Sequence, residues 1–168
     1  MDIFVINSEK ANSVSADLLK EFEHKNFVNE SQKKIHRFTY LMLDRILKEF
    51  YNISNRSIVF NENKPVLETN EKTFSLSHSG DYIVIAFSDC NCGVDIEKTK
   101  IRDYKKISER MGFNSASLKN FYYNWTKYEA EYKLGGKTES SYCFEIPEYV
   151  ISCVSKNPEE KYEIYYNL

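Results

Sequence analysis

Three acidic side chains are spaced so that they could hold a divalent cation. Asp95 and Glu97 lie two apart in the segment Gly93-Val94-Asp95-Ile96-Glu97-Lys98, and Glu129 follows in Trp125-Thr126-Lys127-Tyr128-Glu129-Ala130. If the first segment is a strand, its two carboxylates project from one face, roughly 7 Å apart. Carboxylates this close repel unless a cation lies between them, and Mg²⁺ prefers oxygen ligands that it shares with a substrate phosphate. The pattern predicts a hard-cation site, although Asp95 and Glu97 alone are better explained as the polar face of an edge strand.

The elements that would position these acids can be predicted from apolar periodicity. Apolar residues at three-to-four spacing predict a helix over 31–50, and a shorter helix begins near Ser13 or Ser15 and contains Leu18, Leu19 and Phe22. Helices are also expected over 102–111 and 115–134, the latter ended by Gly135-Gly136. The turn 89–91 is expected to form a hairpin between the strands 82–87 and 93–97. The other expected strands cover 3–6, 57–60, around 65–67, 73–76, 141–144, 149–154 and 162–166.

The helix over 115–134 is expected to carry two neighbouring rows of side chains. Phe121, Trp125, Tyr128 and Tyr132 form an apolar stripe, with Trp125 assigned to the core rather than to chemistry. Trp125, Glu129 and Lys133 step by four along the adjacent edge, about 6 Å apart. Glu129 and Lys133 could equally be an ordinary surface ion pair, which contributes only about 0.3–0.5 kcal/mol.

Composition restricts the classes of protein that the chain could belong to. Its 168 residues, 42% hydrophobic and 29% charged, predict one compact globular domain or two tightly packed lobes. Because the expected strands and helices are mixed without strict alternation, we expect an α+β fold with mainly antiparallel sheets. A net charge of −2 argues against a generally basic nucleic-acid binder, and no apolar stretch reaches the length of a membrane span. Four cysteines without zinc-type spacing and the absence of a signal-peptide pattern favour a cytoplasmic protein. The basic clusters near 33–37 and 98–106 are most simply solvated faces.

Three blocks of sequence carry a resemblance to a known family. They are Phe74-Ser75-Leu76-Ser77-His78-Ser79-Gly80, Gly93 to Lys98, and Trp125-Thr126-Lys127-Tyr128-Glu129-Ala130-Glu131-Tyr132-Lys133, preceded by a weaker block, Phe60-Asn61-Glu62-Asn63-Lys64-Pro65. In this order they resemble the 4′-phosphopantetheinyl transferase superfamily, most closely the surfactin-synthetase-activating type, over residues 25–133. The resemblance implies two pseudo-repeated α/β lobes, 1–91 and 92–168, of which the second is reduced because only 32 residues follow Gly136.

The resemblance also implies an activity and a set of site residues. Such enzymes move the 4′-phosphopantetheine arm of coenzyme A onto a serine of an acyl or peptidyl carrier protein and release adenosine 3′,5′-bisphosphate. Asp95, Glu97 and Glu129 match the family's ligands for Mg²⁺ or Mn²⁺. Glu129 or a metal-bound water would accept the serine proton, and Lys133 would neutralise the departing phosphate. The coenzyme contacts implied are Lys25, Arg37, Lys64, Ser77 and His78.

One departure from the family pattern leaves alternatives open. Tyr128 stands where the family usually has lysine, so that it either packs inward or marks a retuned site. A degenerate module that binds coenzyme A or a carrier without turnover is therefore an alternative. A hydrolase that uses Ser77 and His78 is disfavoured, because adjacent residues on a strand point to opposite faces. A monomer is expected, with a homodimer as the alternative.

Overall fold

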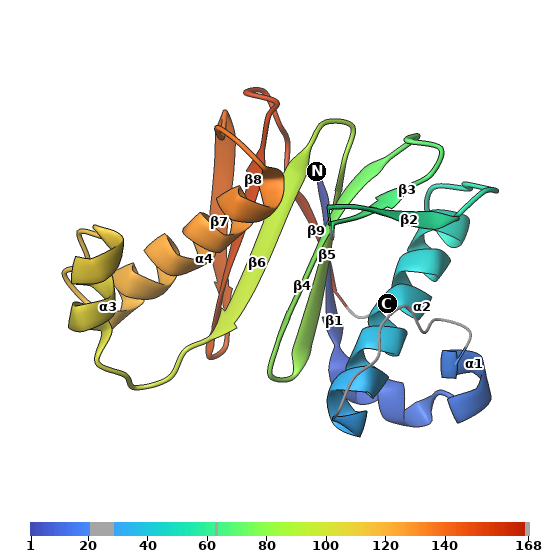
Figure 1. The fold of residues 1–168 in the computed structure, drawn as a ribbon, viewed down its shortest axis with the longest axis horizontal. Helices are drawn as coiled ribbons and strands as arrows, with labels where there is room; N and C mark the ends of the chain where they lie inside the picture. The colour runs from blue at the N-terminus through green and yellow to red at the C-terminus, as the bar shows by residue number, and fades with distance from the viewer. Residues whose placement is uncertain (21–28, 63, 167–168) are drawn as a thin grey trace.

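The computed structural model describes residues 1–20, 29–62 and 64–166, which form two sheets packed face to face between helices (Figure 1). The first sheet has the order β4-β5-β1-β9 and contains β1 (Asp2–Asn7), β4 (Thr73–Ser79), β5 (Tyr82–Ser88) and β9 (Glu163–Tyr166). The second has the order β6-β8-β7 and contains β6 (Cys92–Lys98), β7 (Ser140–Ile146) and β8 (Tyr149–Ser155). All pairs within these sheets are antiparallel except β1–β9. The prediction of a mixed α+β chain with mainly antiparallel sheets is thus confirmed.

The helices cover the outer faces of the two sheets. A 3₁₀ helix (Ser8–Ser13) that was not predicted and α1 (Ala16–Lys20) precede α2 (Glu30–Glu49), which packs against the first sheet. Asn29 begins α2, because its side chain accepts the backbone N–H groups of Ser31 and Gln32. The second sheet carries α4 (Leu118–Leu134), which follows α3 (Tyr104–Met111). Figure 1 shows α2 and α4 on opposite sides of the molecule, with a separate hairpin of β2 (Ile58–Asn61) and β3 (Lys64–Leu67) near α2.

Alternation along the strands divides the core into layers. In β1, Phe4 and Ile6 face α2, whereas Ile3 and Val5 face the second sheet and pack with side chains such as Ile96. A strand that is buried on both faces reads as a continuous apolar run, and this is what the sequence of β1 has. The expected elements are confirmed to within a few residues at their ends.

The buried row of α4 differs from the predicted stripe. The buried residues of α4 are Phe121, Tyr122, Thr126, Ala130 and Leu134. Of the predicted apolar stripe, Phe121 is fully buried, whereas Tyr128 and Tyr132 are 42% and 77% exposed, so only the first part of the stripe packs inward. The small side chain of Ala130 lets α4 lie close to β6 at Gly93, whereas Phe121 and Tyr122 fill the core nearer the start of the helix.

The predicted hairpin between β5 and β6 is also wrong. The chain does reverse after β5, but β6 pairs with β8 of the second sheet and not with β5. Turn residues specify that the chain reverses, and they do not specify which strand becomes the hydrogen-bonded partner. β6 runs instead beside β4, so that the edges of the two sheets meet (Figure 1).

The predicted lobe boundary at residue 91 falls where the chain passes from the first sheet to the second. β9 then returns to the first sheet and pairs in parallel with β1, and the division into 1–91 and 92–168 stays a prediction. No helix in residues 1–20, 29–62 and 64–166 has both the length and the apolar character of a membrane span. Three predicted residues, Phe22, Lys25 and Asn63, lie outside the described residues.

Candidate active site

The two acids of β6 lie where the edges of the two sheets meet, beneath α4. Asp95 is 6% exposed, and its Oδ1 accepts hydrogen bonds from Ser77 Oγ at 2.8 Å and from Lys133 Nζ at 2.7 Å. Its other oxygen, Oδ2, is buried and meets no donor in the part of the chain that the structure describes. Glu97 is half-buried; its Oε1 accepts from Trp125 Nε1 and its Oε2 from Ser79 Oγ, each at 3.3 Å.

Two members of the predicted row on α4, Trp125 and Lys133, contact these acids. Lys133 Nζ donates to Asp95 Oδ1 and, at 3.0 Å, to the Val94 carbonyl. Burial raises the pKa of Glu129, and the neighbouring carboxylates of Asp95 and Glu97 raise it further against the opposing effect of Lys133. The three predicted acids and Lys133 therefore share one electrostatic environment.

Trp125 packs, partly buried, against the core cluster of Phe121, Tyr122 and Val150, as predicted, and it also makes a polar contact. Its ring is half-buried against Phe121, with the ring centroids 6.0 Å apart, but its indole N–H is directed at Glu97. The sequence did contain a signal for this role, because Trp125 precedes Glu129 by four residues and so lies on the same helix edge.

The described residues contain no group of three or more acidic, histidine or cysteine side chains arranged closely enough to hold a metal ion. The Lys133 ammonium lies against Asp95 and supplies positive charge there. One feature nevertheless suits a divalent cation, namely the buried Asp95 Oδ2, since a buried carboxylate oxygen without a partner is costly. Asp95, Glu97 and Glu129 also supply the hard oxygen donors that Mg²⁺ and Mn²⁺ prefer.

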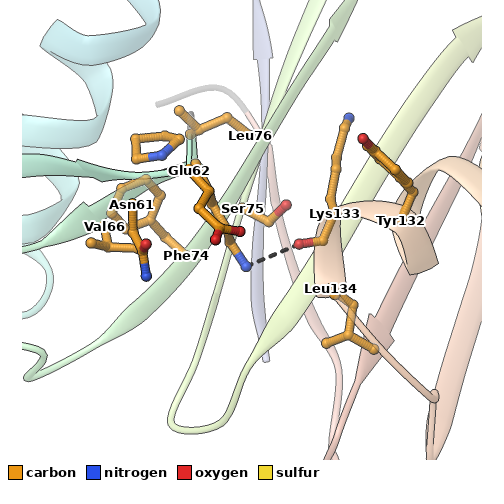
Figure 2. Close-up of a pocket in the computed structure, with 12 residues that line it drawn as sticks. Asn61, Glu62, Val66, Phe74, Ser75, Leu76, Tyr132, Lys133 and Leu134 are labelled. Atoms are coloured by element: carbon orange, nitrogen blue, oxygen red, sulfur yellow. Dashed lines mark hydrogen bonds between the residues drawn. The ribbon is translucent and has the colours of Figure 1, made fainter.

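A cavity of about 630 Å³ is lined in part by Lys133, the residue that donates to Asp95 (Figure 2). It is bounded by the β2–β3 hairpin, by β4 and by the end of α4, and Lys64 Nζ joins the hairpin to the helix by donating to the Lys133 carbonyl at 3.0 Å. Burial lowers the pKa of Lys64, and the charge of Lys156 lowers it further, although Cys92 acts in the opposite direction. The walls combine polar and apolar side chains, the latter being Pro65, Val66, Phe74, Leu76 and Leu134.

The hydroxyl of Ser77, a predicted coenzyme contact, makes two hydrogen bonds to β6. It donates its one proton to Asp95 Oδ1 and accepts the Ile96 N–H at 3.4 Å. While the hydroxyl donates this hydrogen bond to Asp95, it has no second proton to donate to a phosphate oxygen. The same bond leaves Ser77 without the histidine partner that the disfavoured hydrolase would need.

The remaining predicted coenzyme contacts are spread over several elements. His78 is exposed to solvent. Its pKa is lowered because neighbouring protein atoms displace water from part of the ring; the charge of Lys133 lowers the pKa further, and that of Asp95 raises it. Arg37 is half-buried on α2, the helix that covers the first sheet. Lys64 and Lys133 meet at the cavity, and Lys25 lies outside the described residues.

Comparison of the amino-acid sequence with known proteins shows to which family the chain belongs. No family model matches the chain. The 4′-phosphopantetheinyl transferase psf-1 of Bacillus pumilus is 30% identical over 166 aligned positions, which span 82% of this chain and 70% of that protein. The chain belongs to the 4′-phosphopantetheinyl transferase family. The match confirms the resemblance to the surfactin-synthetase-activating type and identifies the chain as a transferase of that class.

In this transferase, Tyr128 stands at the usual lysine position and is not packed inward as one alternative predicted. Its ring lies 5.9 Å from that of Phe113 and 6.4 Å from that of Trp125, with 42% of the residue exposed. The neighbouring Lys127 lies 3.9 Å from Glu131, one turn along α4. At this position the transferase therefore has an aromatic ring with a hydroxyl group in place of a cation.

Proposed function

We propose that the chain transfers the 4′-phosphopantetheine arm of coenzyme A to a serine of an acyl or peptidyl carrier protein, with release of adenosine 3′,5′-bisphosphate. The observation that carries this proposal is that Lys133, which lines the cavity, donates to the buried Asp95 and acts on the pKa of Glu129, in a member of this transferase family. The product would be the holo form of the carrier, which corresponds to a holo-[acyl-carrier-protein] synthase activity.

The cavity supports coenzyme A as the donor of the arm. Its apolar wall suits the aliphatic portions of pantetheine, and Lys64 and Lys133, which line the cavity, would supply positive charge to a pyrophosphate. We assign the remaining phosphate contacts to His78, Arg37 and Lys25, by resemblance to the family.

A divalent cation, Mg²⁺ or Mn²⁺, is part of the proposal. Asp95, through its unpaired Oδ2, together with Glu97 and Glu129 would hold it. When bound, such an ion neutralises the charge that develops on the pyrophosphate oxygens.

The side chains account for the proton and for the leaving group. The carrier serine Oγ forms a bond to the phosphorus that bears the pantetheine arm, and its proton passes to the Glu129 carboxylate. The bond from that phosphorus to the bridging oxygen breaks, and adenosine 3′,5′-bisphosphate leaves with the electron pair. Its raised pKa makes Glu129 a stronger proton acceptor than an ordinary glutamate, and Lys133 neutralises the departing phosphate.

Intact-mass measurement tests the transfer directly. The chain is incubated with coenzyme A, Mg²⁺ and a panel of apo-carrier proteins, and the acceptor is expected to gain the mass of the arm. Asp95→Ala and Glu129→Ala are each expected to lower the rate about 10²–10³-fold. Glu131→Ala, which removes an acid from the Lys127 side of the same helix, is the matched control. A folded chain that modifies no carrier in the panel would contradict the proposal.

A second candidate is a module that binds coenzyme A or a carrier protein without turnover. It is favoured by Tyr128 at the lysine position and by the bond that holds Lys133 on Asp95. Calorimetry that detects Mg²⁺-dependent binding of coenzyme A, together with no product in the mass assay, would select this candidate. Any measurable turnover eliminates it.

A further inference from the structure

The edges of the two sheets are joined by three serine side chains, which we call the serine ladder: Ser75, Ser77 and Ser79 of β4. Their hydroxyl oxygens accept the backbone N–H groups of β6 residues that lie 19 positions further along the chain, at 3.0, 3.4 and 3.0 Å. The constant offset means that β4 and β6 run parallel and in register. The serine ladder therefore replaces a backbone ladder and fixes where β6 lies relative to β4.

Two rungs of the serine ladder also reach an acid of the candidate active site. Ser77 donates to Asp95 and Ser79 to Glu97, each 18 positions further along the chain. At the same offset from Ser75 the chain has Gly93, which has no side chain to receive a proton. Ser75 thus makes the backbone rung without an acid partner, and Ser79 makes both.

The second bond of Ser79 has a defined direction. Because one lone pair of its hydroxyl accepts the Lys98 N–H, the single proton is directed away from β6's backbone and toward Glu97 Oε2. The other oxygen of Glu97 accepts the indole N–H of Trp125 from α4. The carboxylate is therefore held at both oxygens, by groups on two different elements.

We propose that Ser79 is a positioning residue that holds the Glu97 carboxylate in the orientation needed to bind a divalent cation. The proposal rests on the proposed function, which makes Glu97 a ligand. Partners that orient a metal ligand affect affinity for the metal, and their removal typically costs about 10–100-fold. A serine that only joined the sheets would behave as Ser75 does.

Trp125 provides a readout of Glu97 that is independent of turnover, because it is the only tryptophan in the chain. The indole ¹H–¹⁵N signal reports its hydrogen bond to Glu97. We expect Ser79→Ala to move this signal and Ser79→Thr, which keeps the hydroxyl, to restore it. Ser75→Ala removes a backbone rung without freeing an acid, and it is expected to leave the signal near its native position. If Ser79→Ala is unstable, Ser79→Cys keeps the volume with a much weaker donor and gives the same comparison.

Mn²⁺ alone, which is paramagnetic, then tests the role in metal binding. Titration is expected to broaden the native indole signal, and Ser79→Ala should raise the Mn²⁺ concentration for half-broadening about 10-fold. Ser75→Ala should change it less than about 2-fold. Equal midpoints for the two variants, or an indole signal that Ser79→Ala does not move, would overturn the role of Ser79 and leave the proposed function intact. Absence of broadening in the native chain would instead remove the metal assignment from the proposed function, and the positioning role with it.

Discussion

Gly93 is the position at which a single added methyl group is expected to disrupt the active site most directly. A Cβ at this position would lie 2.0 Å from the carbonyl oxygen of Ala130, and 3.0 Å from the Leu134 nitrogen. Both are backbone atoms of α4 and have no rotamer by which to move aside. Ordinary van der Waals contact begins at 3.4 Å, so the Ala130 oxygen must move away from the strand by about 1.4 Å, the difference between 3.4 and 2.0 Å.

That displacement separates the two halves of the candidate active site. Asp95 and Glu97 move with β6, whereas Glu129 and Lys133 move with α4. Overpacking of this kind costs about 1–3 kcal/mol, which for a chain of this length lowers Tm by about 2–12 °C. A misplacement of about 1 Å between reacting groups can cost about 10²-fold in rate, and we expect Gly93→Ala to lose transfer activity by about this factor.

Urea unfolding and the mass assay, both performed below the transition, separate the two effects. Gly112→Ala is the control, because a Cβ there has open space and costs about 1–2 kcal/mol only through the left-handed backbone that ends α3. We expect both variants to lose stability and only Gly93→Ala to lose transfer activity per folded molecule. A Gly93→Ala variant that keeps the native rate would refute the idea that close packing of α4 on β6 sets the distance between the acids.

Three further substitutions test individual side chains. Glu129→Gln is expected to lower transfer about 10²–10⁴-fold, since an amide cannot accept the serine proton, with Glu131→Gln as the control. Burial and Asp95 raise the pKa of Glu129, so the native rate should fall on acidification through a pH above the ordinary value of 4.5, and a rate–pH profile that falls only below 4.5 would contradict its role as base. Lys64→Gln is expected to raise KM for coenzyme A more than it lowers kcat, and steady-state kinetics with the reverse pattern would argue against a phosphate contact. Tyr128→Lys should change the free energy of unfolding by no more than about 1.5 kcal/mol, because the ring is partly exposed, and should not lower the transfer rate; a slower variant would mean that the tyrosine itself serves the site.

Features that depend on local periodicity could be predicted from the sequence. Asp95 and Glu97 lie on one face of a strand because they are two apart, and Trp125, Glu129 and Lys133 lie on one helix edge because they step by four. The start of α2 follows from Asn29 and the end of α4 from Gly135, since helix capping depends on residues that are neighbours in the chain.

Features that depend on contacts between distant segments could not be predicted. The pairing of β6 with β8 joins residues more than 50 positions apart, and no local pattern specifies that choice. The inward row of α4 is set by the approach of Ala130 to Gly93, which a helical pattern on its own does not encode. For the same reason the sequence did not reveal the hydrogen bond from Ser77 Oγ to Asp95 Oδ1, at 2.8 Å, because the two residues lie on strands of different sheets.

The bond between Lys133 and Asp95 explains how a stable fold can bury Asp95. Asp95 is almost fully buried, and a buried carboxylate without a cation is strongly destabilising. Lys133 supplies that charge from α4 at 2.7 Å, and Ser77 adds a hydrogen bond to the same oxygen from β4. Oδ1 is thus satisfied within the protein and Oδ2 is left for another partner. The same residue can therefore stabilise the fold through one oxygen and take part in the proposed chemistry through the other.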